Sequence, residues 1–387
     1  MSHPLWQAAH RPLFFCAGLW ALVAPSVWLW PGGLGPDPVG WHLHELLFGM
    51  GGAAVGGYLL TALPHWTGRA RVSPRLVRAL TLLWVLARLG MLVAQYVPHG
   101  VLVVLETSYF AGLGAVMTRQ IAAARVWPRL GFVVGVAGLG VGDAATLAGM
   151  RGMIAAPQLH LAMVLYFAVL LTIIGGRAIP AFGESWRRQS GASWRVRRAS
   201  VPVALAASLT ALAGSFILMG NDVAAGYCLF LAGGLQMAAL AGWQSVPTRR
   251  HPSLLMLHAA WFWVPAAQIL IGYAILHPEV IAYSTALHAL TMGAMGCMIL
   301  AIAGRAAMAR QGNRLIASRG LLLAFSLVWL SAPMRLLSPF ITTLVGFDPI
   351  FAAAVLWISG WAAFLVSFVP ALRGEVPWPI LSARQPH

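Results

Sequence analysis

The chain has 387 residues, of which 60% are hydrophobic and only 9% are charged, and this excludes an ordinary soluble globular domain. A net charge of +16 would suggest nucleic acid as the partner of a soluble protein. Here, however, apolar runs of about 20 residues recur along the whole length, and each can cross a bilayer as a helix. We predict an all-α polytopic membrane protein with about twelve transmembrane helices. The expected spans are residues 12–30, 42–64, 76–97, 100–124, 129–150, 155–180, 200–219, 222–244, 254–276, 280–303, 317–340 and 350–372.

The longest hydrophilic stretch divides these spans into two groups of six. It is the arginine-rich segment 183–199, which we predict to be a cytoplasmic loop. Helices 1–6 are expected at about residues 12–182 and helices 7–12 at about residues 200–372. Because so little chain lies outside the spans, residues 1–387 are interpreted as a single integral membrane domain.

The arginines predict the orientation of the chain in the membrane. When the spans alternate in direction, 22 of the 25 arginines fall on one side, and the short loops on the other side carry acidic residues instead. The positive-inside rule then places both termini in the cytoplasm, as in a multi-pass protein of the bacterial inner membrane. The basic charge thus reflects topology in a lipid bilayer, and nucleic acid is not an expected partner.

Two of the spans share a short pattern of histidine and glycines. His44, Gly49 and Gly52 have the same spacing as His288, Gly293 and Gly296. A match of this kind indicates an internal repeat, although glycine-rich membrane helices also produce such matches by chance.

The second span begins with polar residues where hydrocarbon is expected. The sequence Trp41-His42-Leu43-His44-Glu45 places two imidazoles and a carboxylate there, which is costly unless something binds them. In a regular α-helix His42 and Glu45 lie on one stripe with Gly49, and His44 faces roughly the opposite way. Each histidine is therefore either a ligand of haem or metal, or a structural residue held by hydrogen bonds.

Other spans carry polar residues at a similar depth, in the outer half of the membrane. These are Glu106, Asp143, His160, His288 and Arg335. Their common depth predicts one shared site near the outer surface. Imidazoles from separate helices are the arrangement that haem ligation in a bundle needs, whereas interhelical hydrogen bonds are the alternative reading.

One further histidine and two arginines have other candidate roles. His258 falls in the cytoplasmic half, where it would belong to a second, inner site with His65 as its candidate partner. Arg88, near mid-depth, and Arg335 either form ion pairs with the buried acids or hold haem propionates, because a guanidinium suits carboxylates.

Several segments resemble the NnrS family at the right spacing over most of the chain. They are residues 41–49, 60–68, 175–182, 257–258 and 288–293. The resemblance implies a haem- and copper-containing membrane protein linked to nitric oxide metabolism and protection against nitrosative stress. The chain departs from the family pattern at His65, where the family often has Asn, and at residues 311–314, where it lacks a histidine that the family often has.

The expected function follows from the polar residues and this resemblance together. Haem b would lie between helices, with axial imidazoles from His42, His44, His160 and His288, and copper would bind a remaining imidazole. His258 and Arg335 are further cofactor-binding candidates, and Glu45, Glu106, Asp143 and Arg177 complete the predicted site. Nitric oxide would be the small ligand, with a respiratory electron donor as a candidate partner, and the sequence leaves open whether the protein is an enzyme.

Two other functions fit parts of the sequence. Twelve spans around a central loop, with buried acids and histidines that can relay protons, are also typical of a secondary transporter. A membrane factor that delivers haem or copper to a respiratory enzyme is the third reading.

Overall fold

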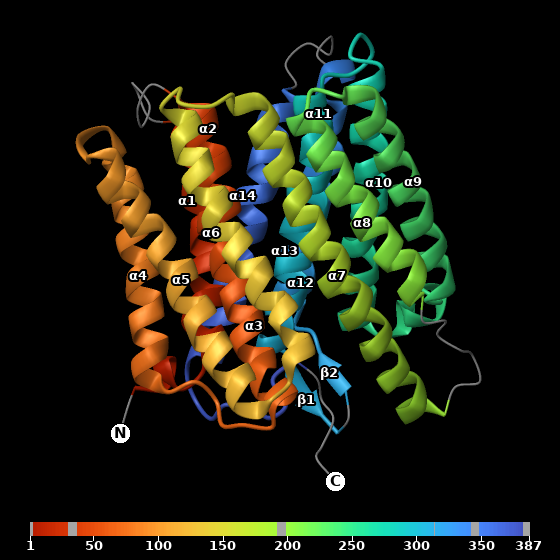
Figure 1. Ribbon diagram of the computed structural model, residues 1–387. Coiled ribbons are helices and arrows are strands. Elements are labelled where there is room, and N and C mark those ends of the chain that lie inside the picture. Colours follow the sequence, from red (N-terminus) through yellow and green to blue (C-terminus); the bar gives the residue numbers. More distant parts are fainter. Residues whose placement is uncertain (1–2, 30–36, 192–198, 313, 342–347, 382–387) are drawn as a thin grey trace. The chain divides into compact units, whose positions relative to one another are not determined.

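The protein is built almost entirely of helices (Figure 1). The structure, a computed structural model, describes residues 3–29, 37–191, 199–312, 314–341 and 348–381. Ten helical segments in this part of the chain are long and apolar enough to cross a membrane. The other two expected spans correspond to α1 (His10–Val23), which is shorter, and α4 (Pro74–Leu92), which carries three arginines. The predicted all-α polytopic fold is confirmed.

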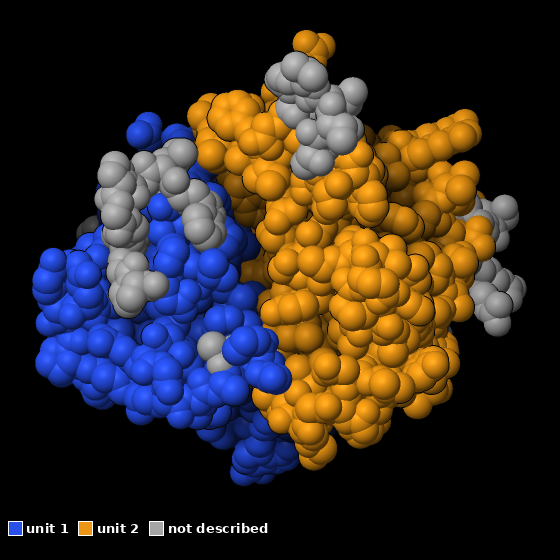
Figure 2. Space-filling model, turned by 90° about the horizontal axis from the view of Figure 1, so that it is seen from above, with its two compact units in different colours: residues 1–160, 368–377 blue, residues 161–367, 378–387 orange. Residues whose placement is uncertain are grey.

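The chain forms two compact units, which Figure 2 shows in different colours. Unit 1 comprises residues 1–160 and 368–377, and unit 2 comprises residues 161–367 and 378–387. The first of the three boundaries between them in the sequence lies inside the long helix α7 (Ala156–Ser190). The segment 183–199, expected to be a loop, is helical as far as Ser190, and residues 192–198 lie outside the described residues.

Unit 1 is a bundle of long helices around one irregular segment. Its elements are α1, α2 (Pro38–His44), the π-helix η3 (Glu45–Gly51), α3 (Gly52–Thr67), α4, α5 (His99–Ala124) and α6 (Leu130–Met150). Helix α5 packs against α3, α4 and α6, and α1 packs against α3 and η3. α2 begins where the Asp37 side chain accepts a hydrogen bond from the Gly40 amide at 2.8 Å, with Pro38 in the first turn.

The N-terminal residues and the segment 368–377 lie together at one end of unit 1. Arg11, which is 1% exposed, donates hydrogen bonds to the carbonyls of Pro4 at 2.6 Å and Gly374 at 3.0 Å. Backbone carbonyls thus accept the hydrogen bonds of this buried arginine. Through these bonds, Arg11 connects the start of α1 to the segment 368–377.

Unit 2 is organised around α10 (Pro252–Leu276). Its other elements are α7 from Leu161 onward, α8 (Ser200–Leu218), α9 (Asp222–Gly242), α11 (Tyr283–His288), the π-helix η7 (Ala289–Gly296), α12 (Cys297–Ala307), α13 (Arg319–Ile341) and α14 (Pro349–Phe368). Helix α10 packs against α9, α12 and η7. A buried chain of hydrogen bonds links α7 to α10, because Gln236 donates to Thr172 and Gln268, and Gln268 donates to Thr210. Such bonds are a common means of helix association in membranes.

A small hairpin follows α12, where the sequence predicted no strands. The strands β1 (Ala309–Gln311) and β2 (Arg314–Ile316) pair antiparallel, and Gly312 between them has a φ of +54°. Glycine adopts this left-handed conformation without strain, which permits the tight turn. Three-residue strands are too short for a pattern of alternating hydrophobicity to reveal them.

Candidate functional site

The second membrane segment changes its helical geometry where its polar residues lie. α2 ends at His44, Glu45–Gly51 form the π-helix η3, and α3 continues from Gly52. A π-helix has wider turns than an α-helix and is frequent at functional sites. The stripe of His42, Glu45 and Gly49 predicted from α-helical spacing is therefore interrupted, and the side chains that follow it are rotated about the helix axis.

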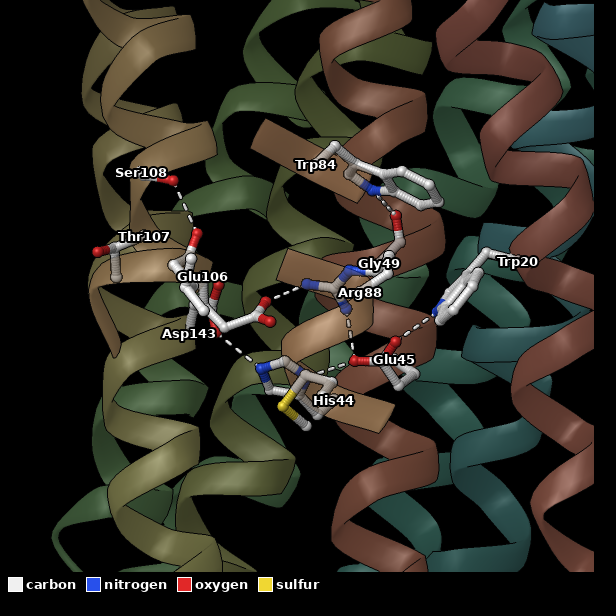
Figure 3. Close-up of polar contacts among 12 residues, drawn as sticks. Trp20, His44, Glu45, Gly49, Trp84, Arg88, Glu106, Thr107, Ser108 and Asp143 are labelled. Atoms are coloured by element: carbon white, nitrogen blue, oxygen red, sulfur yellow. Dashed lines mark hydrogen bonds and ion pairs between the residues drawn. The ribbon is translucent and has the colours of Figure 1, made fainter. Parts of the chain in front are cut away.

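His44 lies in a buried cluster of charged side chains in unit 1 (Figure 3). Its Nε2 atom lies 2.7 Å from Oδ1 of Asp143 in α6, and its Nδ1 atom lies 2.9 Å from Oε1 of Glu45. The relative exposure of all three residues is 0%. α-Helical spacing predicts that His44 faces away from Glu45, and this prediction is wrong, since the two side chains are hydrogen-bonded to each other.

Arg88 of α4 connects two carboxylates in this cluster. Its Nη1 donates to Glu45 Oε1 at 2.5 Å, and its Nη2 forms an ion pair with Oε2 of Glu106 in α5. Glu45 Oε2 in turn accepts a hydrogen bond from the indole of Trp20 at 2.5 Å. Of the two interpretations of Arg88, the ion pair with buried acids is the one found in the structure.

Two tryptophans enclose the cluster next to a glycine. The Trp84 indole donates to the carbonyl of Gly49 at 2.9 Å, and the Arg88 guanidinium lies 5.9 Å from the centre of the Trp84 ring, within range of a cation–π contact. A Cβ atom at Gly49 would come within 2.5 Å of Trp20. Position 49 therefore requires glycine, because the π-helical backbone lies directly against these side chains.

The cluster carries more negative than positive charge. Glu45, Glu106 and Asp143 share it with one guanidinium and one imidazole, so with all three carboxylates ionised it has one excess negative charge even when His44 is protonated, and only a proton or a bound cation can cancel that charge. Glu106 Oε1 and Asp143 Oδ2 are buried without a hydrogen-bond partner. One ligand atom each from His44, Glu106 and Asp143 lie within 4.8 Å of one another. A net charge and unpaired oxygens are costly in such an interior, and both give the cluster unused capacity to bind a cation.

Two other predicted ligands lie in unit 1. His42 is half-buried, and its Nδ1 atom lies 3.5 Å from the carbonyl oxygen of Ala24. His160 is half-buried at the start of α7, and its Nε2 atom is buried without a hydrogen-bond partner. His65, the candidate partner for an inner site, is exposed near the end of α3.

The remaining predicted residues belong to unit 2. His288 is half-buried and its Nδ1 lies 2.8 Å from the carbonyl of Ser284, one turn earlier. His258 is buried, with Nδ1 2.7 Å from the Ser245 hydroxyl. Arg335 is half-buried and donates to Ser338 of the same helix at 2.9 Å, and Arg177 is exposed. The structure thus brings together four of the predicted residues, namely His44, Glu45, Glu106 and Asp143.

Sequence reasoning missed the tryptophans that complete the cluster. Trp20 and Trp84 lie in apolar spans, where an indole contributes to the hydrophobic pattern and gives no polar signal. It also missed that His44 and His288 each directly precede a π-helix, η3 in one case and η7 in the other. The shared spacing to Gly49 and Gly293 was a signal for this, and it corresponds to a repeated local backbone geometry.

A comparison with curated proteins finds no match. The family model of the NnrS protein matches residues 4–375, which include most of both units and every residue of the cluster. This match covers nearly the whole chain, and the protein therefore belongs to the NnrS family.

Proposed function

We propose that the protein binds haem b and copper within its membrane helices and acts in the response to nitric oxide. Membership in the NnrS family supports the role in that response. The haem and the copper are inferred from the imidazoles inside the spans, since imidazole is a ligand that suits both metals.

The proposal rests mainly on the surroundings of the His160 imidazole. Its Nε2 atom is buried and has no hydrogen-bond partner, although a buried polar atom is normally satisfied. A bound metal ion would provide the missing partner, because a neutral imidazole binds metal through the lone pair of such a nitrogen. The residues present therefore fit an imidazole-ligated cofactor.

Two other histidines have the hydrogen bond that orients a ligating imidazole. His288 Nδ1 lies 2.8 Å from the Ser284 carbonyl, and His42 Nδ1 lies 3.5 Å from the Ala24 carbonyl. A carbonyl only accepts, so Nδ1 carries the hydrogen and the lone pair is on Nε2, the tautomer common among metal-ligating histidines. His44 is less suited to haem, because both of its ring nitrogens are engaged by carboxylates.

The proposed roles can be assigned residue by residue. His42, His160 and His288 would hold the haem, a remaining imidazole would hold copper, and the guanidinium of Arg335 would suit a haem propionate. When bound, haem would supply an iron to which nitric oxide, a small molecule that partitions into lipid, can bind. The helices contribute a water-poor surrounding and fixed imidazoles.

An optical spectrum of the purified protein tests the proposal. We expect a Soret band that shifts when nitric oxide is added to the reduced protein, together with copper in the elemental analysis. A folded protein without a Soret band would refute the haem, and a folded protein without copper would refute the copper site. Metal that chelators remove easily, with no consumption of nitric oxide, would favour delivery to a respiratory enzyme instead.

The buried acids support transport as the second candidate function. Glu106 has a buried carboxylate oxygen without a partner, and carboxylates of this kind relay protons in transporters. Substrate-dependent proton flux in liposomes, with no tightly bound metal, would support transport and contradict the haem protein.

The same proposal includes an orientation in a bacterial inner membrane with cytoplasmic termini. The arginine distribution supports it. The bonds from Arg11 to the carbonyls of Arg373 and Gly374 are consistent with an even number of crossings, because they hold both ends of the bundle on one side of unit 1. Labelling of single cysteines introduced near either terminus, from each side of the membrane, tests this topology.

A further inference from the structure

We propose that the charged cluster of unit 1 is a binding site for a divalent transition-metal ion, separate from haem. The ligands are the Nε2 atom of His44 and the carboxylates of Glu106 and Asp143. This inference does not depend on the proposed haem, because it rests only on the contacts of these side chains (Figure 3).

The three ligands come from three different helices and converge on one point. His44 ends α2, Glu106 lies in α5 and Asp143 lies in α6, and one ligand atom from each lies within 4.8 Å of the others. All three are at most 1% exposed. Ligand atoms at this separation need to move only slightly to surround an ion at about 2.0–2.2 Å from imidazole nitrogen and carboxylate oxygen.

Unpaired oxygens give a second, independent indication of a ligand. Glu106 Oε1 and Asp143 Oδ2 are both buried and neither has a hydrogen-bond partner. Each belongs to a carboxylate whose other oxygen is held, Glu106 by Arg88 and Asp143 by His44. The carboxylates are thus fixed in place, each with one oxygen still to be satisfied.

Glu45 orients His44 as an outer partner of the ion. Its Oε1 lies 2.9 Å from His44 Nδ1, which leaves Nε2 as the atom that faces Asp143. Carboxylate, histidine and metal in this order are a frequent arrangement, in which the carboxylate fixes the tautomer and raises the basicity of the ring. An entering cation replaces the hydrogen between Nε2 and Asp143 Oδ1, so binding releases one proton.

The charges of the cluster select a divalent ion. When its three carboxylates are ionised they carry −3 and Arg88 carries +1, so an ion of charge +2 with a neutral His44 brings the total to zero. A monovalent ion such as Cu(I) would leave a buried net charge, and it prefers thiolate or thioether ligands to carboxylates. One imidazole with carboxylates is instead a ligand set for ions such as Zn²⁺ or Mn²⁺.

Metal titration of the full-length protein in detergent tests this site. The protein is first treated with chelator and then titrated with Mn²⁺ or Zn²⁺ alone, and bound metal is measured. We expect one equivalent to bind to the wild type and to be lost in Glu106→Gln and Asp143→Asn. Glu184→Gln is the matched control, because Glu184 is an acid paired with Arg187 and Arg188 outside the cluster. Glu45→Gln should bind about 10- to 100-fold more weakly.

A measurement on the wild type keeps the test decisive even if a cluster variant fails to fold. X-ray absorption of the Zn²⁺-loaded protein should show one imidazole and otherwise oxygen ligands. The proposal would be overturned if the wild type bound less than one equivalent of metal. It would also be overturned if the coordination shell of Zn²⁺ contained two or more imidazoles. The haem spectrum distinguishes this result from the proposed function, because Asp143→Asn should lose the divalent ion and keep any Soret band of the wild type.

Discussion

Arg88 and Glu45 form an ion pair of 2.5 Å in the interior of unit 1, where both side chains are buried. The carboxylate also binds His44 and Trp20, and the guanidinium also binds Glu106. Arg88 is therefore the only guanidinium among the described partners of these acids, and it compensates two carboxylates at once. Its removal would leave both charges buried.

Arg88→Gln should destabilise the protein strongly. Breaking a buried ion pair by removing one partner costs about 3–5 kcal/mol, because the other charge stays buried without compensation. Arg188→Gln is the control, since Arg188 has a side-chain exposure of 69% in its pair with Glu184 and such surface pairs contribute about 0–1 kcal/mol. Denaturant unfolding in detergent measures both changes. Equal stability of the two variants would mean that the cluster is not held together by Arg88.

Gly49→Ala should destabilise the π-helical segment and disturb the cluster. A Cβ atom there would lie 2.5 Å from Cδ1 and 2.7 Å from Nε1 of Trp20, so the indole that donates to Glu45 must move. Overpacking of this kind costs about 1–3 kcal/mol. Gly234→Ala in α9 has nothing within 4 Å of its new Cβ, and it should stabilise by about 0.5–1 kcal/mol, as expected in a helix interior. Thermal unfolding measures both variants. If Gly49→Ala and Gly234→Ala shifted the unfolding temperature in the same direction, the close contact at Gly49 would be contradicted.

The helical membrane architecture could be predicted from the sequence because the apolar runs are long and recur along the chain. Runs of apolar residues predict helices wherever lipid removes water from the backbone, since only internal hydrogen bonds then satisfy the peptide groups. Two local features, the hairpin and the extension of α7, could not be predicted. The hairpin at β1 and β2 is too short to show a period, and nothing in the composition of residues 183–190 distinguishes a helix extending beyond the membrane from a polar loop.

The site could be predicted in part, because charged side chains are energetically unfavourable inside a membrane span unless they have partners. The common depth of the polar residues predicted one shared site, and four of them, His44, Glu45, Glu106 and Asp143, lie together in the structure. The predicted orientation of His44 was wrong, since its Nδ1 atom contacts the carboxylate of Glu45, the first residue of the π-helix η3. The sequence also left open whether Arg88 and Arg335 pair with the acids or hold haem propionates, and only the tertiary structure pairs Arg88 with the acids.

The stability of unit 2 should fall as the pH decreases below 6.5, because of His251. This residue precedes α10 and is 8% exposed, and burial together with the positive charges of Arg305 and Arg314 lowers its pKa from 6.5 to about 4. The unfolded chain therefore takes up a proton first, so this part of the stability is complete above pH 6.5 and is lost between pH 6.5 and about 4. His251→Gln should reduce the dependence of the unfolding temperature on pH across this range. The exposed His65→Gln should leave it unchanged, and an equal effect of both variants would contradict the assignment.

His160→Ala should lower the haem content of the purified protein. His160 Nε2 is a buried imidazole nitrogen without a hydrogen-bond partner, so a ligated iron is what would satisfy it. Removal of an axial ligand should shift the Soret band or abolish it, whereas His65→Ala should preserve the spectrum because that imidazole is exposed. Helical content and a monodisperse elution profile must match the wild type, since this separates loss of a ligand from loss of the fold. If imidazole added to the His160→Ala protein restores the band, the residue acts through the iron. If the spectrum of His160→Ala equals that of the wild type, His160 is not a ligand, and the unpaired nitrogen then requires another partner in the membrane.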